Sequence, residues 1–381
     1  MTWAEWAEAK NAKTRAKGRW RTLADFDAIG PRGFLSDGGR RNDGSTVVSF
    51  ASNDYLGLSA HPAVVAAAHD AIDKWGAGAG ASRLVSGTRP VHSELEAALA
   101  DWKSSEAALV FPTGYTANVG VLSAIAGPQV LICSDELNHA SIIDGCRLAK
   151  SLGAVVEVYP HCDVDAVSKL LSSASGRAVV VTDAVFSMDG DVAPLDELAR
   201  ACSQHDALLV VDEAHSVLGP HFADFPCDAL RVGTLSKTLG SQGGFVAGRR
   251  LMTEMLVNRS RSFIFTTALA PSNAAAAKAA LEVLRSPEGE QLLARLAGHV
   301  ARFTGTGPVL SPIVPVVVGG EQEAIAASGA LMEEGLFVPA IRPPTVPPGT
   351  SRLRVTLSAA HSDQEVLQLL SALEGLGLRA R

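Results

Sequence analysis

Short runs of apolar residues alternate along most of the chain with longer stretches in which apolar positions recur every three or four residues. The first pattern is typical of buried strands, and the second is typical of helices that cover them. Continuous apolar strands separated by helices predict an α/β fold with a mostly parallel sheet and helices on both faces. The expected strands are 107–111, 130–133, 155–159, 178–182, 207–211 and a stretch around 245–247, and the expected helices are 63–75, 91–102, 140–152, 163–171 and 195–205.

The amino-terminal segment differs from this central alternation. Trp3 and Trp6 are three positions apart and precede a run rich in lysine and arginine, so residues 1–21 are predicted to form an amphipathic helix that docks through its tryptophans. We favour this interpretation, with the basic charges exposed to solvent, over a nucleic-acid-binding arm. The glycine-rich stretch 30–45 is expected to form a hairpin or loop ahead of the main body.

The carboxy-terminal part also changes in composition. From about residue 272 an alanine-rich helix leads into a proline-rich region, which is followed by a predicted strand at 352–357 and a last helix that reaches residue 376. We therefore expect a smaller α+β domain at this end. The predicted units are an N-terminal helix and hairpin segment (1–47), a large α/β domain (48–275) and a small C-terminal α+β domain (276–381).

Composition and charge exclude several classes of protein. Among 381 residues, 47% are hydrophobic and 19% are charged, which excludes intrinsic disorder, and the net charge of −7 argues against nucleic acid as a partner. No apolar run reaches the roughly 18 residues of a membrane span, so no membrane partner is expected. The five cysteines contain no C-x-x-C pair, which argues against a disulfide framework or a cysteine-rich metal site and favours a reducing cytoplasm.

A buried strand ends in the sequence Asp-Glu-Ala-His at residues 212–215. In helicase-type nucleotidases this ending holds Mg²⁺, but that role requires a G-x-x-x-x-G-K-[ST] phosphate loop, and the chain has no Gly-Lys pair. The alternative places Asp212 at the carboxyl end of a parallel strand, where open α/β sheets bind ligands. A carboxylate there can hold a proton on a cofactor ring nitrogen, whereas a structural interpretation makes Asp212 only a helix cap.

Lys237 follows within a loop of hydroxyl-bearing residues and glycines, 234–244. A lysine with such neighbours is a candidate for Schiff-base formation with a carbonyl cofactor, although a lysine in a polar turn would look similar. The combination with Asp212, 25 residues earlier, is more specific. It supplies the covalent lysine and the pyridinium partner that a pyridoxal-phosphate enzyme needs.

Two further segments suit the same cofactor. Residues 112–118 follow a strand and open a helix, and the N–H groups of a helix N-terminus bind phosphate, although many such turns are ordinary connections. His139 follows another strand and is either a ring that stacks on the pyridine or a helix-start histidine.

The glycine loop 76–83 loosely matches a dinucleotide fingerprint but follows a helix and not a strand, so we interpret it as a substrate-facing connection.

Together the motifs resemble the α-oxoamine synthases, which are fold-type I pyridoxal-phosphate-dependent transferases. The resemblance runs from about residue 48 to the end, and residues 340–354 are most similar to the branch that joins L-alanine to a pimeloyl thioester with loss of CO₂ and coenzyme A. The alternative within the family is glycine, serine or another acyl group as substrate, and the second alternative is a non-catalytic protein that retains the fold. The segments that carry the resemblance are 52–58, 78–83, 186–191, 212–215, 234–240 and 342–347.

The resemblance implies a role for each cofactor-site residue. Lys237 would bind the cofactor covalently and remove the α-proton of the amino acid, Asp212 would keep the pyridine nitrogen protonated, and His139 would stack on the ring. His215 and Ser187 would lie near the ring O3′ oxygen. The cofactor phosphate would be held by Gly114, Tyr115 and Thr234, together with Thr266 or Thr267 of a second subunit, which implies a homodimer with shared sites.

The resemblance also implies the substrate contacts. Arg354 would bind the amino-acid carboxylate with two hydrogen bonds, assisted by Asn53, and Arg342 is a possible second partner. Thr345 is expected near the substrates, and Arg21 near the distal end of the acyl chain. The expected partners are therefore L-alanine and an acyl thioester.

Overall fold

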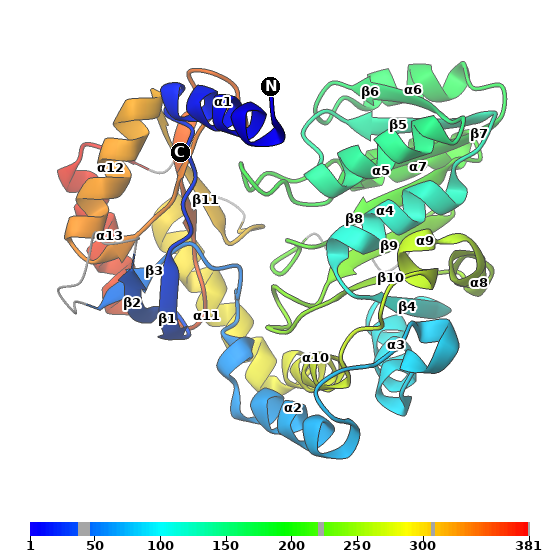
Figure 1. Cartoon of the computed structure of the whole chain (residues 1–381), viewed down its shortest axis with the longest axis horizontal. Helices are drawn as coiled ribbons and strands as arrows, with labels where there is room; N and C mark the ends of the chain where they lie inside the picture. The colour runs from blue at the N-terminus through cyan, green and yellow to red at the C-terminus, as the bar shows by residue number, and fades with distance from the viewer. Residues whose placement is uncertain (37–45, 220–224, 306–308, 380–381) are drawn as a thin grey trace.

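The structure is a computed structural model, and it describes residues 1–36, 46–219, 225–305 and 309–379. Figure 1 shows two bodies, a large one around a central sheet and a smaller one that combines both ends of the chain. Helices α2 (Pro62–Trp75) and α10 (Pro271–Leu284) pack against each other and lie between the two bodies.

The central sheet has seven strands in the order β4-β10-β9-β8-β7-β5-β6. The pairs from β9 to β6 are parallel, and β10 runs antiparallel to both of its neighbours, so the expected mostly parallel sheet is confirmed. The strands are β4 (Ala107–Phe111), β5 (Val130–Asp135), β6 (Val155–Tyr159), β7 (Arg177–Asp183), β8 (Leu208–Asp212), β9 (Ala229–Thr234) and β10 (Gly244–Gly248).

Helices cover both faces of this sheet because successive strand residues point to opposite sides. Val210 packs in a core beneath one set of helices, whereas its neighbours Leu209 and Val211 pack in a separate core on the other face. The first face is covered by α4 (Gly114–Ile125), α5 (Ala140–Ser151), α8 (Arg250–Arg259) and α9 (Arg261–Ile264). The second face is covered by α3 (Pro90–Trp102), α6 (Val164–Ser172), α7 (Leu195–Gln204) and α10.

The smaller body contains two further sheets. One has the order β11-β14-β13, and the other has the order β1-β2-β3-β12, in which β12 pairs in parallel with β3. This pairing joins residues near both ends of the chain. The elements are β1 (Asp25–Ile29), β2 (Arg32–Ser36), β3 (Val47–Ser49), β11 (Ile313–Gly319), β12 (Leu336–Phe337), β13 (Ala340–Ile341), β14 (Ser351–Thr356), α11 (Pro287–Thr304), α12 (Glu321–Glu333) and α13 (Asp363–Gly375), with the short turns η1 (Leu58–Ala60) and η2 (Arg83–Gly87) in the connection to the large body.

One hydrophobic core runs from Phe245 of the central sheet through α2 and α10 to Leu353 of β14. Because the core is shared, residues from the two bodies can be held together in one site. The proposed limits at residues 47 and 275 remain predictions.

The amino-terminal helix departs from expectation. It forms as α1 (Trp3–Ala16) with a capping box at Thr2, but none of its residues is buried, and Trp3 is 82% exposed. Docking through the tryptophans within the chain is therefore wrong. A hairpin forms from β1 and β2, so it begins five residues before the stretch 30–45 where a hairpin or loop was expected, and residues 37–45 of that stretch lie outside the described part. Within the described ranges, no helix is both long and apolar enough to cross a membrane.

Candidate active site

A cavity of about 230 Å³ lies at the carboxyl ends of the parallel strands, where β8 and β9 end. It brings together residues that the sequence analysis singled out separately. The lining residues are Thr113, Gly114, Tyr115, His139, Ser141, Asp183, Asp212, Ala214, His215, Thr234, Ser236 and Lys237.

Asp212, the last residue of β8, is buried and held in a fixed orientation. Its Oδ1 accepts the Ala214 N–H at 2.9 Å, and its Oδ2 accepts the amide of Asn118 at 2.6 Å. Asp183, at the end of neighbouring β7, is fully buried. Burial is the main cause that raises the pKa of Asp183 well above its usual value, and repulsion from Asp212 is the second. The site thus presents one firmly oriented carboxylate beside a carboxyl group that favours the neutral form.

Lys237 lies in the loop after β9, and its Nζ is 2.9 Å from Nε2 of His215. Burial lowers the pKa of Lys237, against the attraction of Asp212 and Asp183. Burial also lowers the pKa of His215 well below its usual value, and the charge of Lys237 adds to this effect. A neutral imidazole can accept a hydrogen bond from the amine, and a lowered pKa increases the fraction of neutral, nucleophilic lysine.

A chain of hydrogen bonds connects Lys237 to Arg354 of β14. His215 Nδ1 contacts the hydroxyl of Tyr55, and this hydroxyl donates to Asn53 Oδ1 at 3.2 Å. Asn53 Oδ1 also accepts from Arg354 Nη2 at 3.2 Å. If the Tyr55 hydroxyl donates to Asn53, His215 must donate from Nδ1, which leaves Nε2 as the acceptor for the lysine.

Arg354 is held from three sides. Besides Asn53, its Nη1 donates to Thr356 Oγ1 at 2.9 Å, and its Nε donates to the carbonyl of Ser187. Only 6% of Arg354 is exposed, so its guanidinium is a fixed, buried cation at the junction of the two bodies. A cation of this kind suits a carboxylate substrate.

The start of α4 is suited to binding a phosphate group. Thr113 caps the helix, and the first N–H groups of a helix have no partner within it. A Cβ on Gly114 would lie 3.3 Å from the Thr234 side chain, and one on Gly244 would lie 2.5 Å from the Gly114 nitrogen. Small residues therefore let the helix N-terminus, Thr234 and the lysine loop approach one another, and the residues present fit a phosphate-bearing cofactor, with Asp212 and His139 lining the same cavity.

His139 caps the start of α5. Its backbone N–H donates to Asp183 Oδ2 at 2.8 Å, and its ring Nδ1 is 2.8 Å from the Ser141 hydroxyl. His139 lines the cavity and remains partly open to solvent. Partial desolvation by the surrounding groups lowers its pKa, which favours a neutral ring suited to stacking.

A larger cleft of about 920 Å³ lies beside this cavity, between the large body and the proline-rich loop of the small one. Ser187 and Thr345 line it, and so does Arg352, which is paired with Asp189. Arg19 lines the cleft as well, whereas Arg21 is exposed and is not among its lining residues.

The remaining expected residues lie outside the small cavity or at its edge. Arg342 donates from Nη1 to the Gly18 carbonyl at 3.0 Å and so fixes the segment after α1. Tyr115 is 44% exposed, and its hydroxyl donates to Asp144. Thr266 is partly exposed and Thr267 is exposed, and both follow α9 without lining the cavity of their own chain.

Sequence reasoning assigned no role to several residues that hold the site together. Tyr55 and Asn118 both lay inside segments that had been singled out, yet their contacts to His215 and Asp212 join residues 160 and 94 positions apart. Ser141 and Asp183 complete the surroundings of His139. Their position next to strand ends was the only available signal.

Comparison with known proteins agrees with this geometry. A family model described as aminotransferase class I and II matches residues 45–373. An 8-amino-7-oxononanoate synthase of Anaeromyxobacter dehalogenans is 50% identical over 97% of this chain and 94% of its own length. Among solved structures, a serine palmitoyltransferase from S. paucimobilis with bound pyridoxal phosphate has a TM-score of 0.85 at 30% identity, covering 97% of both chains.

An 8-amino-7-oxononanoate synthase structure from Francisella tularensis has a TM-score of 0.72 at 26% identity, covering 87% of this chain and 98% of that one. The serine palmitoyltransferase and the oxononanoate synthases are α-oxoamine synthases, which agrees with the motifs of this chain. The chain therefore belongs to the class I and II aminotransferase family, in its pyridoxal-phosphate-dependent 8-amino-7-oxononanoate synthase branch.

Proposed function

We propose that the protein condenses L-alanine with a pimeloyl thioester and releases CO₂ and the thiol to give 8-amino-7-oxononanoate, a step of biotin biosynthesis. The observation that carries the proposal is the convergence of Lys237, Asp212 and His139 on one cavity in a chain that is 50% identical to a protein of that name. The acyl carrier is coenzyme A or a carrier protein.

The cofactor would be held by residues already in position. Gly114, Tyr115 and Thr234 would bind its phosphate, Asp212 would hold a proton on its ring nitrogen, and His139 would lie against its ring. His215 and Ser187 would lie near its O3′ oxygen. When bound, pyridoxal phosphate withdraws the electrons left by the departing α-proton or carboxyl group of the amino acid.

Proton transfer is assigned to Lys237. Its Nζ would form the covalent link to the cofactor and, once displaced by the amino acid, take the α-proton. Support comes from its burial-lowered pKa, because a neutral amine is both the better nucleophile and the better base. His215 would orient Nζ by accepting one of its hydrogens at 2.9 Å.

The amino-acid carboxylate is assigned to Arg354, with Asn53 as its supporting contact. Arg354 is 6% exposed and its Nε is held by the Ser187 carbonyl, so the guanidinium is oriented before substrate binds. A fixed fork matches the two oxygens of a carboxylate, which favours an amino acid over an amine as substrate.

The acyl chain is assigned to the cleft of about 920 Å³, near Thr345. A pimeloyl chain ends in a carboxyl group or its ester, and Arg21 is proposed to contact that end. Arg342 would hold the chain segment after α1, which contains Arg21, in place. Arg19 is the alternative, because it lines the cleft. Arg21→Ala and Arg19→Ala should be compared: the variant that raises KM for the pimeloyl thioester without changing KM for alanine identifies the contact.

A homodimer with shared active sites is part of the proposal. Thr266 or Thr267 would then complete the phosphate site of the partner subunit, and exposed Leu84, Val85 and Phe265 provide apolar surface for association. We also propose a cytoplasmic location, in keeping with five free cysteines.

Product analysis by mass spectrometry tests the function. Purified holoenzyme should be supplied with alanine, glycine or serine, each with pimeloyl thioester or with an acyl thioester of similar length that lacks the terminal carboxyl. The 30%-identical serine palmitoyltransferase makes serine with a longer acyl group the second candidate. Equal kcat/KM for both acyl groups would refute the pimeloyl assignment, and no product from any pair would refute the enzyme itself.

A further inference from the structure

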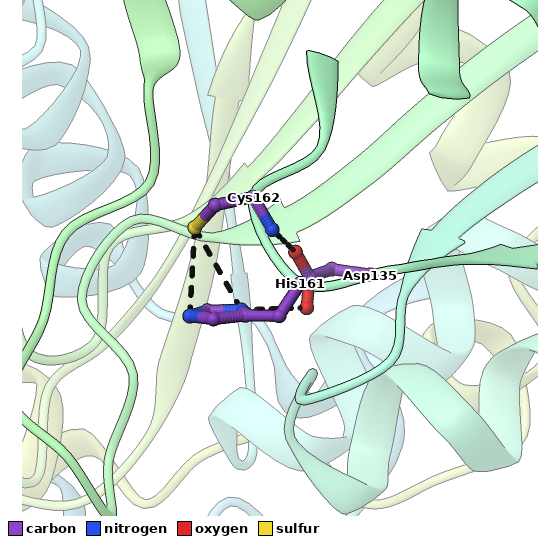
Figure 2. A group of neighbouring side chains, drawn as sticks. All are labelled: Asp135, His161 and Cys162. Atoms are coloured by element: carbon purple, nitrogen blue, oxygen red, sulfur yellow. Dashed lines mark hydrogen bonds and ion pairs between the residues drawn. The ribbon is translucent and has the colours of Figure 1, made fainter. Parts of the chain in front are cut away.

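A second group of chemically active side chains lies apart from the cofactor cavity, where β5 and β6 end. Figure 2 shows Asp135, His161 and Cys162 in contact, with the Cys162 sulfur beside the imidazole ring. An Asp135 carboxylate oxygen, a His161 ring nitrogen and the Cys162 sulfur all lie within 4.8 Å of one another. None of these residues has a role in the proposed reaction.

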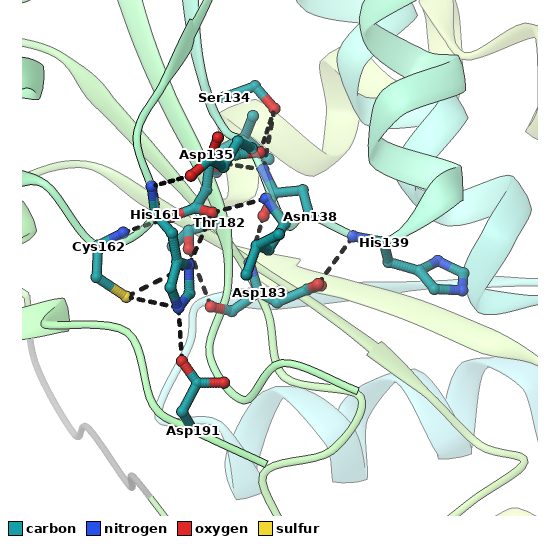
Figure 3. Close-up of polar contacts among 12 residues, drawn as sticks. Ser134, Asp135, Asn138, His139, His161, Cys162, Thr182, Asp183 and Asp191 are labelled. Atoms are coloured by element: carbon teal, nitrogen blue, oxygen red, sulfur yellow. Dashed lines mark hydrogen bonds and ion pairs between the residues drawn. The ribbon is translucent and has the colours of Figure 1, made fainter. Parts of the chain in front are cut away.

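A fourth residue completes the group. Asp191, in the loop after β7, contacts His161 through its carboxylate, as Figure 3 shows. Its Oδ2 is 2.6 Å from His161 Nε2. Its other oxygen, Oδ1, is buried and has no hydrogen-bond partner among the described residues. A buried carboxylate oxygen without a partner is costly, and a bound cation would satisfy it.

We propose that His161 Nε2, Cys162 Sγ and the Asp191 carboxylate bind a divalent transition-metal ion of the zinc type. These are the nitrogen, sulfur and oxygen ligands that Zn²⁺ prefers. We call these three residues and Asp135 the HCD site.

The separation of the His161 and Cys162 ligand atoms supports this ligand set. Zinc bonds of about 2.3 Å to sulfur and about 2.0 Å to nitrogen place the two ligand atoms about 3.5 Å apart in a tetrahedron. Cys162 Sγ is 3.5 Å from His161 Nε2. The Asp191 oxygen, now at 2.6 Å from Nε2, must withdraw by about 0.8 Å to reach the separation of about 3.4 Å that a tetrahedral site requires.

Asp135 is suited to support the site rather than to bind the metal. Its Oδ1 is 3.0 Å from His161 Nδ1, and its Oδ2 accepts the backbone N–H of Cys162 at 2.9 Å. A carboxylate that holds the second ring nitrogen of a metal-binding histidine is a recurrent feature of such sites, since it fixes the ring and the tautomer. Asp135 is almost fully buried, so this contact is rigid.

The backbone also presents the thiol in an uncommon way. Cys162 has φ +58°, a left-handed conformation that residues other than glycine, asparagine and aspartate rarely adopt. In this conformation its sulfur lies against the ring of the adjacent His161, which allows two consecutive residues to reach one ion. Because Asp135 and Asp191 are far away in sequence, a search for C-x-x-C spacing could not detect the group.

Charge and access are compatible with metal binding. Since a carboxylate only accepts hydrogen bonds, the contacts to Asp135 and Asp191 require a proton on each ring nitrogen of His161. A dication that displaces the Nε2 proton and the Cys162 thiol proton leaves the net charge of the group unchanged. His161 and Asp191 line the cleft of about 920 Å³, which gives an ion a path from solvent.

The test uses tag-free holoenzyme and the metals Co²⁺ and Zn²⁺ alone. Co²⁺ should bind one per chain and give the near-ultraviolet charge-transfer band of a cobalt thiolate. Cys162→Asn, which tolerates the left-handed backbone, should abolish this band and weaken Zn²⁺ binding at least 100-fold. Asp135→Asn should weaken it by about 10–100-fold, as loss of a supporting carboxylate typically does.

Cys227→Ser is the matched control, because Cys227 is also partly buried and free but lies outside the HCD site. It should leave the cobalt band and Zn²⁺ affinity unchanged. Melting temperature and circular dichroism of each variant verify the fold. The proposal is overturned if the folded wild type shows no cobalt–thiolate band at millimolar Co²⁺, or if the band survives in Cys162→Asn. Neither readout depends on turnover, so the result is independent of the proposed reaction.

Discussion

Tyr55→Phe tests whether the hydrogen-bonded chain behind Lys237 supports its chemistry. Tyr55 is fully buried, and its hydroxyl contacts His215 Nδ1 and Asn53 Oδ1. Phenylalanine keeps the ring packing and removes only this oxygen. Asn53 retains Arg354 as a partner, but His215, which is 6% exposed, loses its contact at Nδ1.

The size of the expected effect follows from the one hydrogen bond that His215 loses. One buried polar group left without a partner costs about 1–3 kcal/mol, so the free energy of unfolding should fall by that amount. Without the tyrosine oxygen, the Nδ1–H tautomer of His215 loses its support, and Nε2 becomes a poorer acceptor for Lys237. If the same energy is lost in the transition state, kcat should fall by about 5–150-fold, since 1.36 kcal/mol corresponds to tenfold.

Urea unfolding and steady-state kinetics of Tyr55→Phe, His215→Asn and the double variant measure both effects. Tyr159→Phe is the control, because Tyr159 is equally buried but belongs to β6 and does not line the cavity. It should leave kcat unchanged, whatever its effect on stability. Normal kcat in Tyr55→Phe, together with a coupling energy below about 0.5 kcal/mol between the two substitutions, would refute the reasoning.

Three other predictions follow from the site and the fold. Lys237→Ala should lower kcat by several orders of magnitude, because the covalent catalyst is lost; borohydride reduction followed by peptide mapping that labels another lysine would contradict the assignment. Arg354→Lys should raise KM for alanine, because a lysine cannot form the bidentate contact, whereas an increase only in Arg342→Lys would exchange the two roles. Burial lowers the pKa of His361 to about 4 from 6.5, so its neutral form stabilises the fold above pH 6.5, and about 3 kcal/mol is lost as the pH falls through 4. Urea unfolding between pH 7 and 4 should show a flatter profile for His361→Gln, and an unchanged slope would count against this origin.

The central sheet was largely predictable because its strands are continuous apolar runs. β9 was missed, since Arg231 interrupts the run Ala229–Thr234 with a charge. Arg231 is nevertheless 93% buried, and its Nη1 lies 3.1 Å from Glu213 Oε1, so an ion pair made by the tertiary structure compensates its burial. Such a partner cannot be read from local sequence.

The candidate site also contains residues that the sequence could predict and contacts that it could not. Asp212 and His139 follow predicted strands, and the carboxyl ends of parallel strands meet at one edge, so sequence alone could bring these two together. Lys237 was linked to them by its hydroxyl- and glycine-rich loop, 25 residues after Asp212, because the strand before it was missed. Nothing local indicated that Tyr55 would contact His215. The exposed Trp3 shows the opposite case, in which an apolar residue predicted a contact that the single chain does not make.

The small body is part of the site because hydrogen bonds connect its residues to those of the large body. Arg354 comes from β14, Asn53 and Tyr55 come from the segment after β3, and Lys237 comes from the loop after β9. The Tyr55–His215 contact is buried and the other polar contacts among them are part-buried, and buried polar groups are stable only when all partners are present. Separating the bodies would therefore leave Arg354 without Ser187 and His215 without Tyr55 at once, which makes the orientation of the lysine depend on the contact between the two bodies.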